Sequence, residues 1–322
     1  MKTKVLFSLL LLVTLAFGFT DTVTKEFDVS EGGTLTLESD LGSINVTTSG
    51  SDQVKIVLTR KIRNADDDET EDILNKLEMH FDQSGNSVNV DINYDRPRNG
   101  WGSKPQLNLH FEITVPKTYN VDLNTAGGSI SVDDLKGSAT TKTSGGSITL
   151  GRIQGPVKAN TSGGSISLTS SVGDAVLKTS GGGLKIGNVE GTIDGHTSGG
   201  SITIEEARGS VDVSTSGGSI KVNEVAGDLS ASTSGGSIKA YMSKQPKSDC
   251  KLTTSGGGID VYLVKDVKVS VDASTSGGHV STDFPITVQG KLQSSKLKGE
   301  INGGGPQLYL RTSGGSIDIY EK

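Results

Sequence analysis

Apolar and polar residues alternate in two short runs within each unit of a long repeat. The residues four and two positions before a recurring threonine are apolar in nearly every unit, and so are the residues five and seven positions after it. Alternation with a period of two predicts a strand with one buried face, so each unit is expected to contain two short strands. The recurring threonines are Thr125, Thr143, Thr161, Thr179, Thr197, Thr215, Thr233, Thr254, Thr275 and Thr312.

Each threonine opens the motif Thr-Ser-Gly-Gly-Ser-Ile, with minor substitutions. The first seven copies are 18 residues apart, the next two follow at intervals of 21 and the last at 37. A fixed period of this length indicates one coil stacked on copies of itself, with neighbouring coils paired in parallel about 4.8 Å apart. We therefore expect an all-β fold, a single-stranded parallel β-solenoid (right-handed β-helix) with about 18 residues per coil.

The two strands of a unit are out of phase with each other. The threonine continues the inward-facing set of the first strand, so simple alternation would turn the motif isoleucine outward. The chain must therefore change phase at the two glycines, and we expect the second glycine to adopt a positive φ or to lie where no Cβ fits. Another glycine, twelve residues after the threonine, is expected at the opposite corner of the 18-residue coils. The predicted structural turn glycines are Gly42, Gly128, Gly146, Gly164, Gly182, Gly200, Gly218, Gly236, Gly257, Gly278 and Gly315.

Three known classes of solenoid do not match this pattern. Calcium-binding RTX rolls use glycine-rich repeats of about nine residues with an aspartate, whereas these glycines recur every 18 residues. Left-handed hexapeptide helices need an aliphatic residue about every six positions, but Lys136 and Lys142 stand at those positions after Ile130. Ice-binding solenoids display outward Thr-x-Thr pairs, while these threonines lie in the inward register.

The first residues of the chain differ from the repeats. Lys2 and Lys4 precede an apolar stretch, which ends with the small residues Ala16 and Gly18. This pattern predicts a signal peptide over residues 1–18 and an exported protein, located in the periplasm, on the outer cell surface or outside the cell. No other stretch is apolar and long enough to span a membrane, so we expect no transmembrane segment in the mature chain.

Three segments follow the predicted signal peptide. Residues 19–46 are expected to hold the first strands and a degenerate first coil, because the sequence around Gly42 matches the motif in register. Residues 47–112 are expected to be a capping insertion with antiparallel strands and a short helix, since an acidic run precedes apolar residues at helical spacing. Residues 113–322 are expected to form the regular β-solenoid. A cap is expected because an unpaired end coil invites edge-to-edge aggregation.

Charge and cysteine content exclude several possibilities. The formal net charge is −6, and loss of Lys2 and Lys4 with the signal peptide would make it −8. A basic surface is the usual mark of nucleic-acid binding, so we expect no nucleic-acid partner. Cys250, the single cysteine, falls in the inward apolar column and is expected to be a small core residue. One cysteine allows no intramolecular disulfide.

The sequence contains no recognisable catalytic motif. His80, His110, His196 and His279 are scattered, and neither His196 nor His279 is expected to have a recurrent Asp or Glu beside it. His-Glu-x-x-His, nucleophile-elbow and phosphate-loop motifs are all missing. We therefore predict no catalytic residue, no cofactor and no dedicated metal site, and a protein that is not an enzyme.

Outward aspartates mark the candidate binding face. One lies on the strand before the motif in each of six successive repeats, and Lys185, Lys221 and Lys239 occupy outward positions on the other sheet. The two broad faces are therefore expected to differ in the sign of their charge. The aspartates either keep the face solvated or bind divalent cations weakly or a cationic envelope partner. They are Asp174, Asp194, Asp212, Asp228, Asp249 and Asp272.

Several features together resemble a known family. They are the signal peptide, the early motif at residues 42–46, the segments 113–116 and 121–125, the repeated Ser-Gly-Gly-Ser-Ile and the late Gly-Gly-Gly-Pro at 303–306. With these features the chain resembles the bacterial putative-adhesin β-strand-repeat family, which is related to the head GIN domain putative adhesins. The resemblance covers nearly all of the predicted mature chain. It implies a β-solenoid exported to the cell envelope, with adhesion inferred for the family and no catalytic residues to transfer.

We therefore expect a noncatalytic cell-envelope or adhesin-like binding or scaffold protein that presents regular solenoid faces. Its partner would be an envelope protein or a glycan. Two alternatives remain, a carbohydrate-active β-helix enzyme and a purely structural, self-assembling spacer. Activity against a panel of glycans would identify the first alternative, and concentration-dependent assembly would identify the second.

Overall fold

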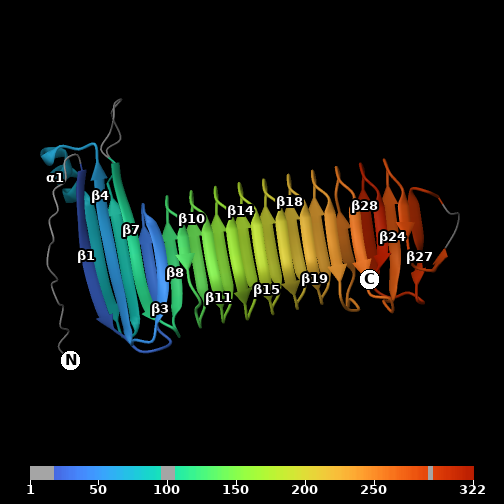
Figure 1. Ribbon diagram of the computed structural model, residues 1–322, viewed down its shortest axis with the longest axis horizontal. Helices are drawn as coiled ribbons and strands as arrows, with labels where there is room; N and C mark the ends of the chain where they lie inside the picture. Colours follow the sequence, from blue (N-terminus) through green and yellow to red (C-terminus); the bar gives the residue numbers. More distant parts are fainter. Residues whose placement is uncertain (1–17, 96–105, 289–292) are drawn as a thin grey trace. The chain divides into compact units, whose positions relative to one another are not determined.

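The computed structural model describes residues 18–95, 106–288 and 293–322, where strands make up nearly all of the regular structure. The chain forms two compact units, one ending at Gln154 and the other beginning at Gly155. Figure 1 shows the strands of both units, coloured along the sequence. Within each unit most neighbouring strands pair in parallel, so the predicted all-β parallel solenoid is confirmed. The predicted signal peptide lies outside the described residues except for Gly18, and it stays a prediction.

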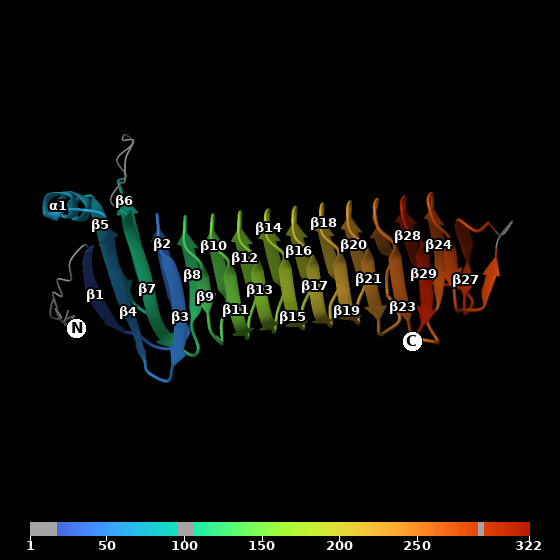
Figure 2. The same ribbon diagram turned by 45° about the horizontal axis from the view of Figure 1, so that its top comes forward.

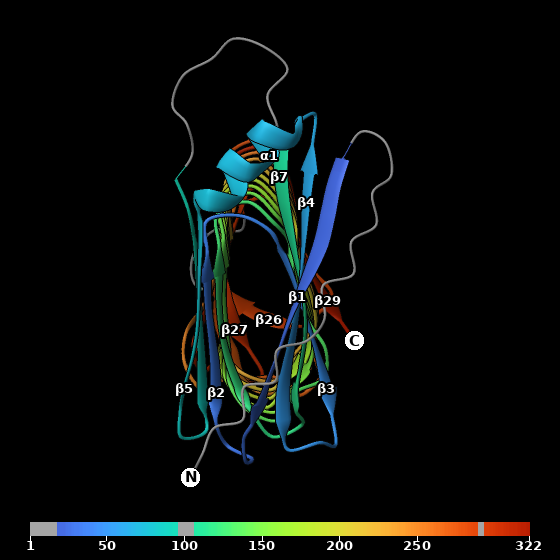
Figure 3. The ribbon, with the colours of Figure 1, turned by 90° about the vertical axis from the view of Figure 1, so that its left-hand side faces the viewer.

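The N-terminal unit contains two sheets and one short helix. One sheet has the strand order β1-β4-β7-β3-β9-β11 and the other the order β5-β6-β2-β8-β10. In Figure 3, β1, β4 and β7 lie on one side of the unit and β2 and β5 on the other. The bounds are β1 Gly18–Asp28, β2 Thr34–Ser39, β3 Ser43–Ser49, β4 Gln53–Arg63, α1 Asp67–Asn75, β5 Leu77–Ser84, β6 Ser87–Tyr94, β7 Gln106–Pro116, β8 Asn120–Thr125, β9 Ile130–Val132, β10 Ala139–Thr143 and β11 Ile148–Ile153.

The early coil pairs with the first regular coil in the expected register. Leu35 on β2 lies opposite Val121 on β8, and Ile44 on β3 lies opposite Ile130 on β9. The segment predicted as an antiparallel insertion is more solenoid-like than expected, because β6 pairs in parallel with β2 and β7 pairs in parallel with β3. Antiparallel pairing links β1 to β4, β4 to β7 and β5 to β6. The capping role of this segment stays a prediction.

The C-terminal unit stacks regular coils, which Figure 2 shows as two layers of strands. One sheet has the order β13-β15-β17-β19-β21-β23-β29-β25 and the other the order β26-β27-β24-β28-β22-β20-β18-β16-β14-β12. We call the first sheet A and the second sheet B. The bounds are β12 Val157–Thr161, β13 Ile166–Ser171, β14 Ala175–Thr179, β15 Leu184–Val189, β16 Ile193–Thr197, β17 Ile202–Ala207, β18 Val211–Thr215, β19 Ile220–Val225, β20 Leu229–Thr233, β21 Ile238–Met242, β22 Cys250–Thr253, β23 Ile259–Leu263, β24 Val269–Thr275, β25 Val280–Thr282, β26 Ile286–Val288, β27 Lys296–Ile301, β28 Gln307–Thr312 and β29 Ile317–Glu321.

The motif threonines form a buried, hydrogen-bonded ladder. Thr197 Oγ1 donates to the carbonyl oxygen of Gly182 in the neighbouring coil at 2.6 Å, and Gly200 N donates back to Thr197 Oγ1 at 3.4 Å. Thr215 and Thr233 make the same pair of contacts. Because the hydroxyl is satisfied as both donor and acceptor, a polar residue can continue the inward column without leaving an unpaired buried atom.

The inward apolar residues form the core between the two sheets. Ile202 on β17 has 0% of its surface exposed, as the alternating pattern predicts. Cys250 is also buried, and burial raises the pKa of its thiol to about 11. The predicted core role of this cysteine is therefore confirmed, since a thiol with such a pKa is almost entirely protonated at neutral pH.

The backbone of the neighbouring coil leaves no room for a side chain at the second motif glycine, which explains why this position is a glycine. A Cβ added at Gly218 would lie 2.2 Å from the carbonyl oxygen of Gly200 in the neighbouring coil. Of the predicted turn glycines only Gly42 has a positive φ, 111°, so the alternative explanation by φ is wrong for the rest. The opposite corner is crowded in the same way, because a Cβ at Gly209 would lie 2.3 Å from the carbonyl oxygen of Gly191. Close backbone contact recurs at Gly128, Gly146, Gly182, Gly200, Gly236, Gly257, Gly278 and Gly315.

The coils of the C-terminal unit follow the order of the sequence except at one place. β28 lies between β22 and β24, and β29 lies between β23 and β25. Residues 307–321 therefore form a coil inserted between the coils of residues 250–263 and 269–282. The antiparallel strands β26 and β27 continue sheet B beyond β24. The expectation that six aspartate-bearing repeats are neighbours in space is thus wrong at its last step.

Candidate functional site

Two of the predicted aspartates at coil corners bind the backbone of a neighbouring coil. Asp174 Oδ1 accepts hydrogen bonds from the backbone N–H and the hydroxyl of Thr192, each at 2.8 Å. Asp249 Oδ1 accepts from the backbone N–H of Gln307 at 2.7 Å. These carboxylates hold the corners of stacked coils, so their first role is structural.

Asp228 makes the same kind of contact at the next corner. Its Oδ1 accepts from the backbone N–H groups of Lys247 and Ser248 at 2.8 and 2.9 Å. Burial disfavours the charged form, but the hydrogen bonds from Ser248 and Lys247 outweigh it and lower the pKa of this carboxyl. The N–H and hydroxyl of Thr192 likewise lower the pKa of Asp174. Both groups are therefore carboxylates at neutral pH.

Two further aspartates lie within strands and form ion pairs. Asp194 on β16 contacts Lys178 Nζ at 3.1 Å and His196 Nε2 at 2.6 Å. Asp272 on β24 accepts from the guanidinium of Arg311 at 2.8 Å, and the same guanidinium donates to the backbone oxygen of Asp272 at 2.6 Å. Neither side chain is free for a ligand without losing these partners.

Asp212 is the exception among the six. It is exposed on β18 and has no hydrogen bond or ion pair with the described residues. Its register partners are Asp194 on β16 and Ser230 on β20, so a second carboxylate lies on the adjacent strand. Two carboxylates at neighbouring positions repel each other, and a cation between them would remove this repulsion.

An open hollow on the outer side of sheet B collects four of these carboxylates. Its volume is about 390 Å³, and it crosses the starts of β16, β18 and β20. The lining combines these carboxylates with polar residues and with the buried side chains of Ile193, Val211 and Leu229 beneath them. The lining residues are Thr192, Ile193, Asp194, Ser210, Val211, Asp212, Asp228, Leu229, Ser230 and Asp249.

The hollow is not a preformed metal site. Across residues 18–95, 106–288 and 293–322, the structure brings together no group of three His, Cys, Asp or Glu side chains that could hold a metal ion. The corner carboxylates already accept backbone hydrogen bonds, so they have fewer oxygens to offer a cation. Weak divalent-cation binding stays a prediction without a built site.

The two faces of the C-terminal unit do not differ in the sign of their charge as expected. Lys178 and Lys251 are exposed on sheet B, which carries the aspartates. Sheet A carries the predicted lysines together with Glu205 and Asp260. Each face therefore carries charges of both signs, and the hollow is a local acidic region.

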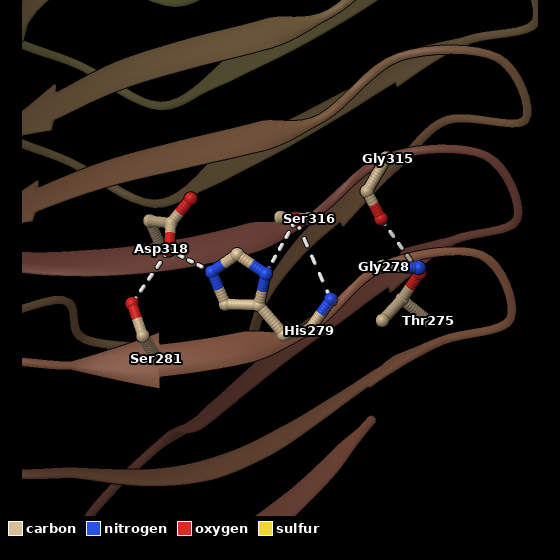
Figure 4. A network of polar contacts seen from close by, with 7 residues as sticks. All are labelled: Thr275, Gly278, His279, Ser281, Gly315, Ser316 and Asp318. Atoms are coloured by element: carbon tan, nitrogen blue, oxygen red, sulfur yellow. Dashed lines mark hydrogen bonds and ion pairs between the residues drawn. The ribbon is translucent and has the colours of Figure 1, made fainter. Parts of the chain in front are cut away.

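His279 has the carboxylate neighbour that sequence reasoning did not foresee. Its Nδ1 lies 3.0 Å from Ser316 Oγ, its Nε2 lies 3.6 Å from Asp318 Oδ1, and Ser281 Oγ donates to the same Asp318 oxygen at 2.5 Å (Figure 4). The partners come from the inserted coil, which the sequence places 37 residues away. A histidine between a serine and a carboxylate has the hydrogen-bond order of a hydrolase triad.

The same arrangement recurs at two other histidines. His196 lies 2.6 Å from Ser214 Oγ and 2.6 Å from Asp194, and His110 lies 2.7 Å from Ser43 Oγ and 3.6 Å from Glu112. The expectation that His196 lacks a carboxylate beside it is therefore wrong. All three sites lie on outer faces, where serines, histidines and acids share adjacent ladder positions. The prediction that the protein is not an enzyme stays a prediction.

Sequence reasoning also missed a stack of three tyrosines on sheet A. Tyr241 and Tyr262 have ring centroids 4.2 Å apart, and Tyr262 and Tyr320 have centroids 4.7 Å apart. The rings stack nearly parallel along the ladder, with interplanar angles of 15° and 22°. All three tyrosines stand eight residues after a motif threonine, a signal that the sequence does contain. The stack joins the inserted coil, through Tyr320, to Tyr262 of the coil of residues 250–263 and from there to Tyr241 on β21.

Comparison with known protein families identifies one family model. Residues 33–320 match the model of the family described as Toastrack DUF4097. No curated protein matches the chain. No helix of the described residues is long and apolar enough to cross a membrane.

Similar solved structures share little sequence with this chain. A putative cell adhesion protein from Clostridium sporogenes is 13% identical with a TM-score of 0.24, covering 94% of this chain and 100% of its own. A putative adhesin from Parabacteroides distasonis is 10% identical with a TM-score of 0.37, covering 94% and 97%. A putative lipid binding protein from the same species is 14% identical with a TM-score of 0.30, covering 92% and 96%.

Proposed function

Because the chain belongs to the Toastrack DUF4097 family, we propose that it is an exported, noncatalytic binding or scaffold protein of the cell envelope. Its recognition site is the acidic hollow on the outer side of sheet B. The ligand is a cationic group of an envelope partner, such as the lysine and arginine side chains of a protein or the ammonium groups of an amino glycan. Export rests on the signal-peptide pattern of residues 1–18.

The unpaired carboxylate of Asp212 is the observation that carries this proposal. The corner aspartates bind backbone and the other strand aspartates bind basic side chains, so structural needs account for them. No structural contact among the described residues explains Asp212, which lies beside Asp194 inside the hollow. A cationic ligand would gain a charge-assisted hydrogen bond there, and because Asp212 is exposed we expect a contribution at the low end of the usual range, about 1.5 kcal/mol.

Titration calorimetry with two cationic probes tests the site. A short oligolysine peptide and a chitosan oligomer represent the protein and glycan versions of the ligand. We expect one of them to bind the native protein, and Asp212→Asn to weaken that binding about tenfold, which corresponds to about 1.4 kcal/mol. Glu224→Gln, which removes one exposed charge from sheet A, should leave the affinity unchanged.

Two results would refute the proposal. If neither probe binds at low salt, the hollow does not recognise cations. If Asp212→Asn and Glu224→Gln weaken binding equally, the interaction depends on net charge and not on the hollow. Measuring at two salt concentrations separates these cases, because a non-specific charge effect weakens steeply as salt rises.

A further inference from the structure

The position of the inserted coil constrains the order in which the coils can pair during folding. Residues 307–321 lie between two coils that both precede them in the sequence. The earlier coils, residues 250–263 and 269–282, do not pair with each other in the finished structure. Until residues 307–321 enter, the coil of residues 269–282 therefore lacks its final neighbour.

The coil of residues 269–282 has the motif residues that it needs to pair directly with the coil of residues 250–263. Thr275 opens a complete Thr-Ser-Gly-Gly motif, and in the finished structure its hydroxyl donates to Gly315 O at 2.6 Å. Thr312 makes the equivalent bond to Gly257 O at 2.6 Å. Gly257 and Gly315 are the same position of the motif, so Thr275 can also donate to Gly257 when residues 307–321 are not in place.

We propose that the coil of residues 269–282 has two docking positions. It first docks directly on the coil of residues 250–263, and residues 307–321 then displace it outward by one strand spacing and lock the end of the unit. In this rearrangement residues 307–321 replace the coil of residues 269–282 as the pairing partner of the coil of residues 250–263. The order of sheet B, β22-β28-β24, is the product of this displacement.

The buried side chains explain why the inserted arrangement is more stable than direct docking of the coil of residues 269–282. Leu310, Ile317 and Ile319 are fully buried against the coil of residues 250–263. Direct docking would put the smaller Ala273 and Val280 and the polar Thr282 in their places, which buries less apolar surface. The inserted coil also adds Tyr320 to the stack on Tyr262 and brings Arg311 to Asp272.

The connection of residues 302–306 keeps residues 307–321 close to the position that they occupy between the two earlier coils. β27 lies on one side of β24 and β28 on the other, and residues 302–306 cross the start of β24 between them. Asn302 Nδ2 donates to the carbonyl oxygens of Lys265 and Val267, both at 2.9 Å, and Ser270 N donates to Pro306 O at 3.1 Å. Anchored there, residues 307–321 stay at high effective concentration beside the junction that they open.

Engineered disulfides in the full chain distinguish the two positions. In the finished structure Asp260 is opposite Asp318, which is opposite Ser281, so Asp260 and Ser281 lie two strand spacings apart, about 10 Å. A disulfide needs Cα atoms within about 7 Å, and direct docking would place these two residues at one spacing. All variants carry Cys250→Ala to remove the native thiol.

We expect Asp260→Cys/Ser281→Cys to form its disulfide when oxidant is present from the start of refolding, and not when oxidant is added after refolding. Asp260→Cys/Thr282→Cys is the matched control, because Thr282 closes nearly the same loop but points to the other side of the strand. It should form at least tenfold less. Asp260→Cys/Asp318→Cys should form when oxidised after refolding, which reports the finished arrangement.

Each contrary result overturns the proposal. Equal yields for the Ser281→Cys and Thr282→Cys variants during refolding would mean that the bond forms in the unfolded chain, without docking. No Ser281→Cys bond at any time would mean that direct docking does not occur. A Ser281→Cys bond formed after refolding, with no Asp318→Cys bond, would mean that residues 307–321 do not occupy the slot.

Discussion

Each motif threonine serves two coils at once. Its hydroxyl donates to a glycine carbonyl in the neighbouring coil and accepts from a glycine N–H in its own, as at Thr215 with Gly200 and Gly218. A valine would fill the same space but leave the carbonyl and the N–H without a partner. The threonine therefore fixes the register of the stack, while the glycine beside it permits the close approach.

At the residue scale, Gly200→Ala should destabilise the C-terminal unit. Its Cβ would lie 2.4 Å from backbone atoms of Gly182, which can move away only if the two coils separate. We expect a loss of about 1–3 kcal/mol, the usual cost of overpacking, measured by urea unfolding. Gly127→Ala is the control, because a Cβ there meets no atom within 4 Å. Equal stability of the two variants would contradict the crowding explanation.

Ile202→Ala should cost about 2–5 kcal/mol by leaving a cavity in the core of its coil. Ile202 is fully buried between the sheets and lies between the register partners Leu184 and Ile220. Thermal unfolding of the variant measures the loss. Thr203→Ala on the adjacent outward position is the matched control and should change stability little. An Ile202→Ala variant as stable as the control would mean that this side chain is not in a packed core.

The corner carboxylates make the unit sensitive to acid. The pKa of Asp228 is lowered in the folded protein, so its contribution to stability is present at pH values above the unfolded pKa. That contribution is lost as the pH falls through the folded pKa, in the region below about pH 4. We expect Asp228→Asn to be less stable than the native protein at pH 7, by up to about 1 kcal/mol, with the difference shrinking at pH 2–3.

Melting temperatures of the native protein and two variants, from pH 7 to pH 2, check this. Asp212→Asn is the control because its carboxylate has no partner to lose. It should match the native protein or exceed it slightly at pH 7, since removing one of two adjacent charges relieves repulsion. A constant difference between Asp228→Asn and the native protein at every pH would contradict the assigned role of the carboxylate.

At the element scale, the regular coils were predictable from the sequence, but the insertion of residues 307–321 between two earlier coils was not. Periodic apolar residues specify strands, faces and register, and Ile202 and Cys250 illustrate how directly that pattern gives burial. They do not specify which coil a given coil contacts, because Thr254, Thr275 and Thr312 carry interchangeable motifs. The inserted position of residues 307–321 depends on larger buried side chains and on the tyrosine stack, which follow from three-dimensional neighbours.

The candidate site was predictable only in part, for the same reason. The outward aspartates were identified from alternation, but alternation does not distinguish Asp228, which binds backbone, from Asp212, which binds nothing among the described residues. That distinction depends on whether an N–H group of the next coil faces the carboxylate. The carboxylate beside His279 comes from the inserted coil, so no repeat-based reasoning could place it there.

At the scale of the whole molecule, three of the four edge strands of the described sheets, β1, β25 and β26, have features that discourage edge pairing. β1, an edge strand, turns Asp21 inward, where it forms a buried ion pair with Arg60. An inward charge discourages a second strand from adding to such an edge. At the far end of the C-terminal unit the edge strands β25 and β26 have three residues each, too short for stable pairing.

Export predicts the first residue of the native protein. Cleavage after Gly18 would remove the apolar segment and leave a chain that begins near Phe19. N-terminal sequencing of the protein purified from the cells that make it, together with fractionation of those cells, tests this. An intact Met1 in the cytoplasmic fraction would contradict export and, with it, an envelope partner.

The central claim is that the hollow on sheet B contacts a partner through Asp212. Photo-cross-linking in living cells tests it most directly, with the photoreactive amino acid p-benzoylphenylalanine placed at Ser230, which lines the hollow, or at Lys221 on sheet A. We expect a discrete cross-linked adduct from the Ser230 position, none from the Lys221 position, and loss of the adduct when Asp212→Asn is added. Adducts of equal yield from both positions, or an adduct from Ser230 that persists with Asp212→Asn, would contradict it.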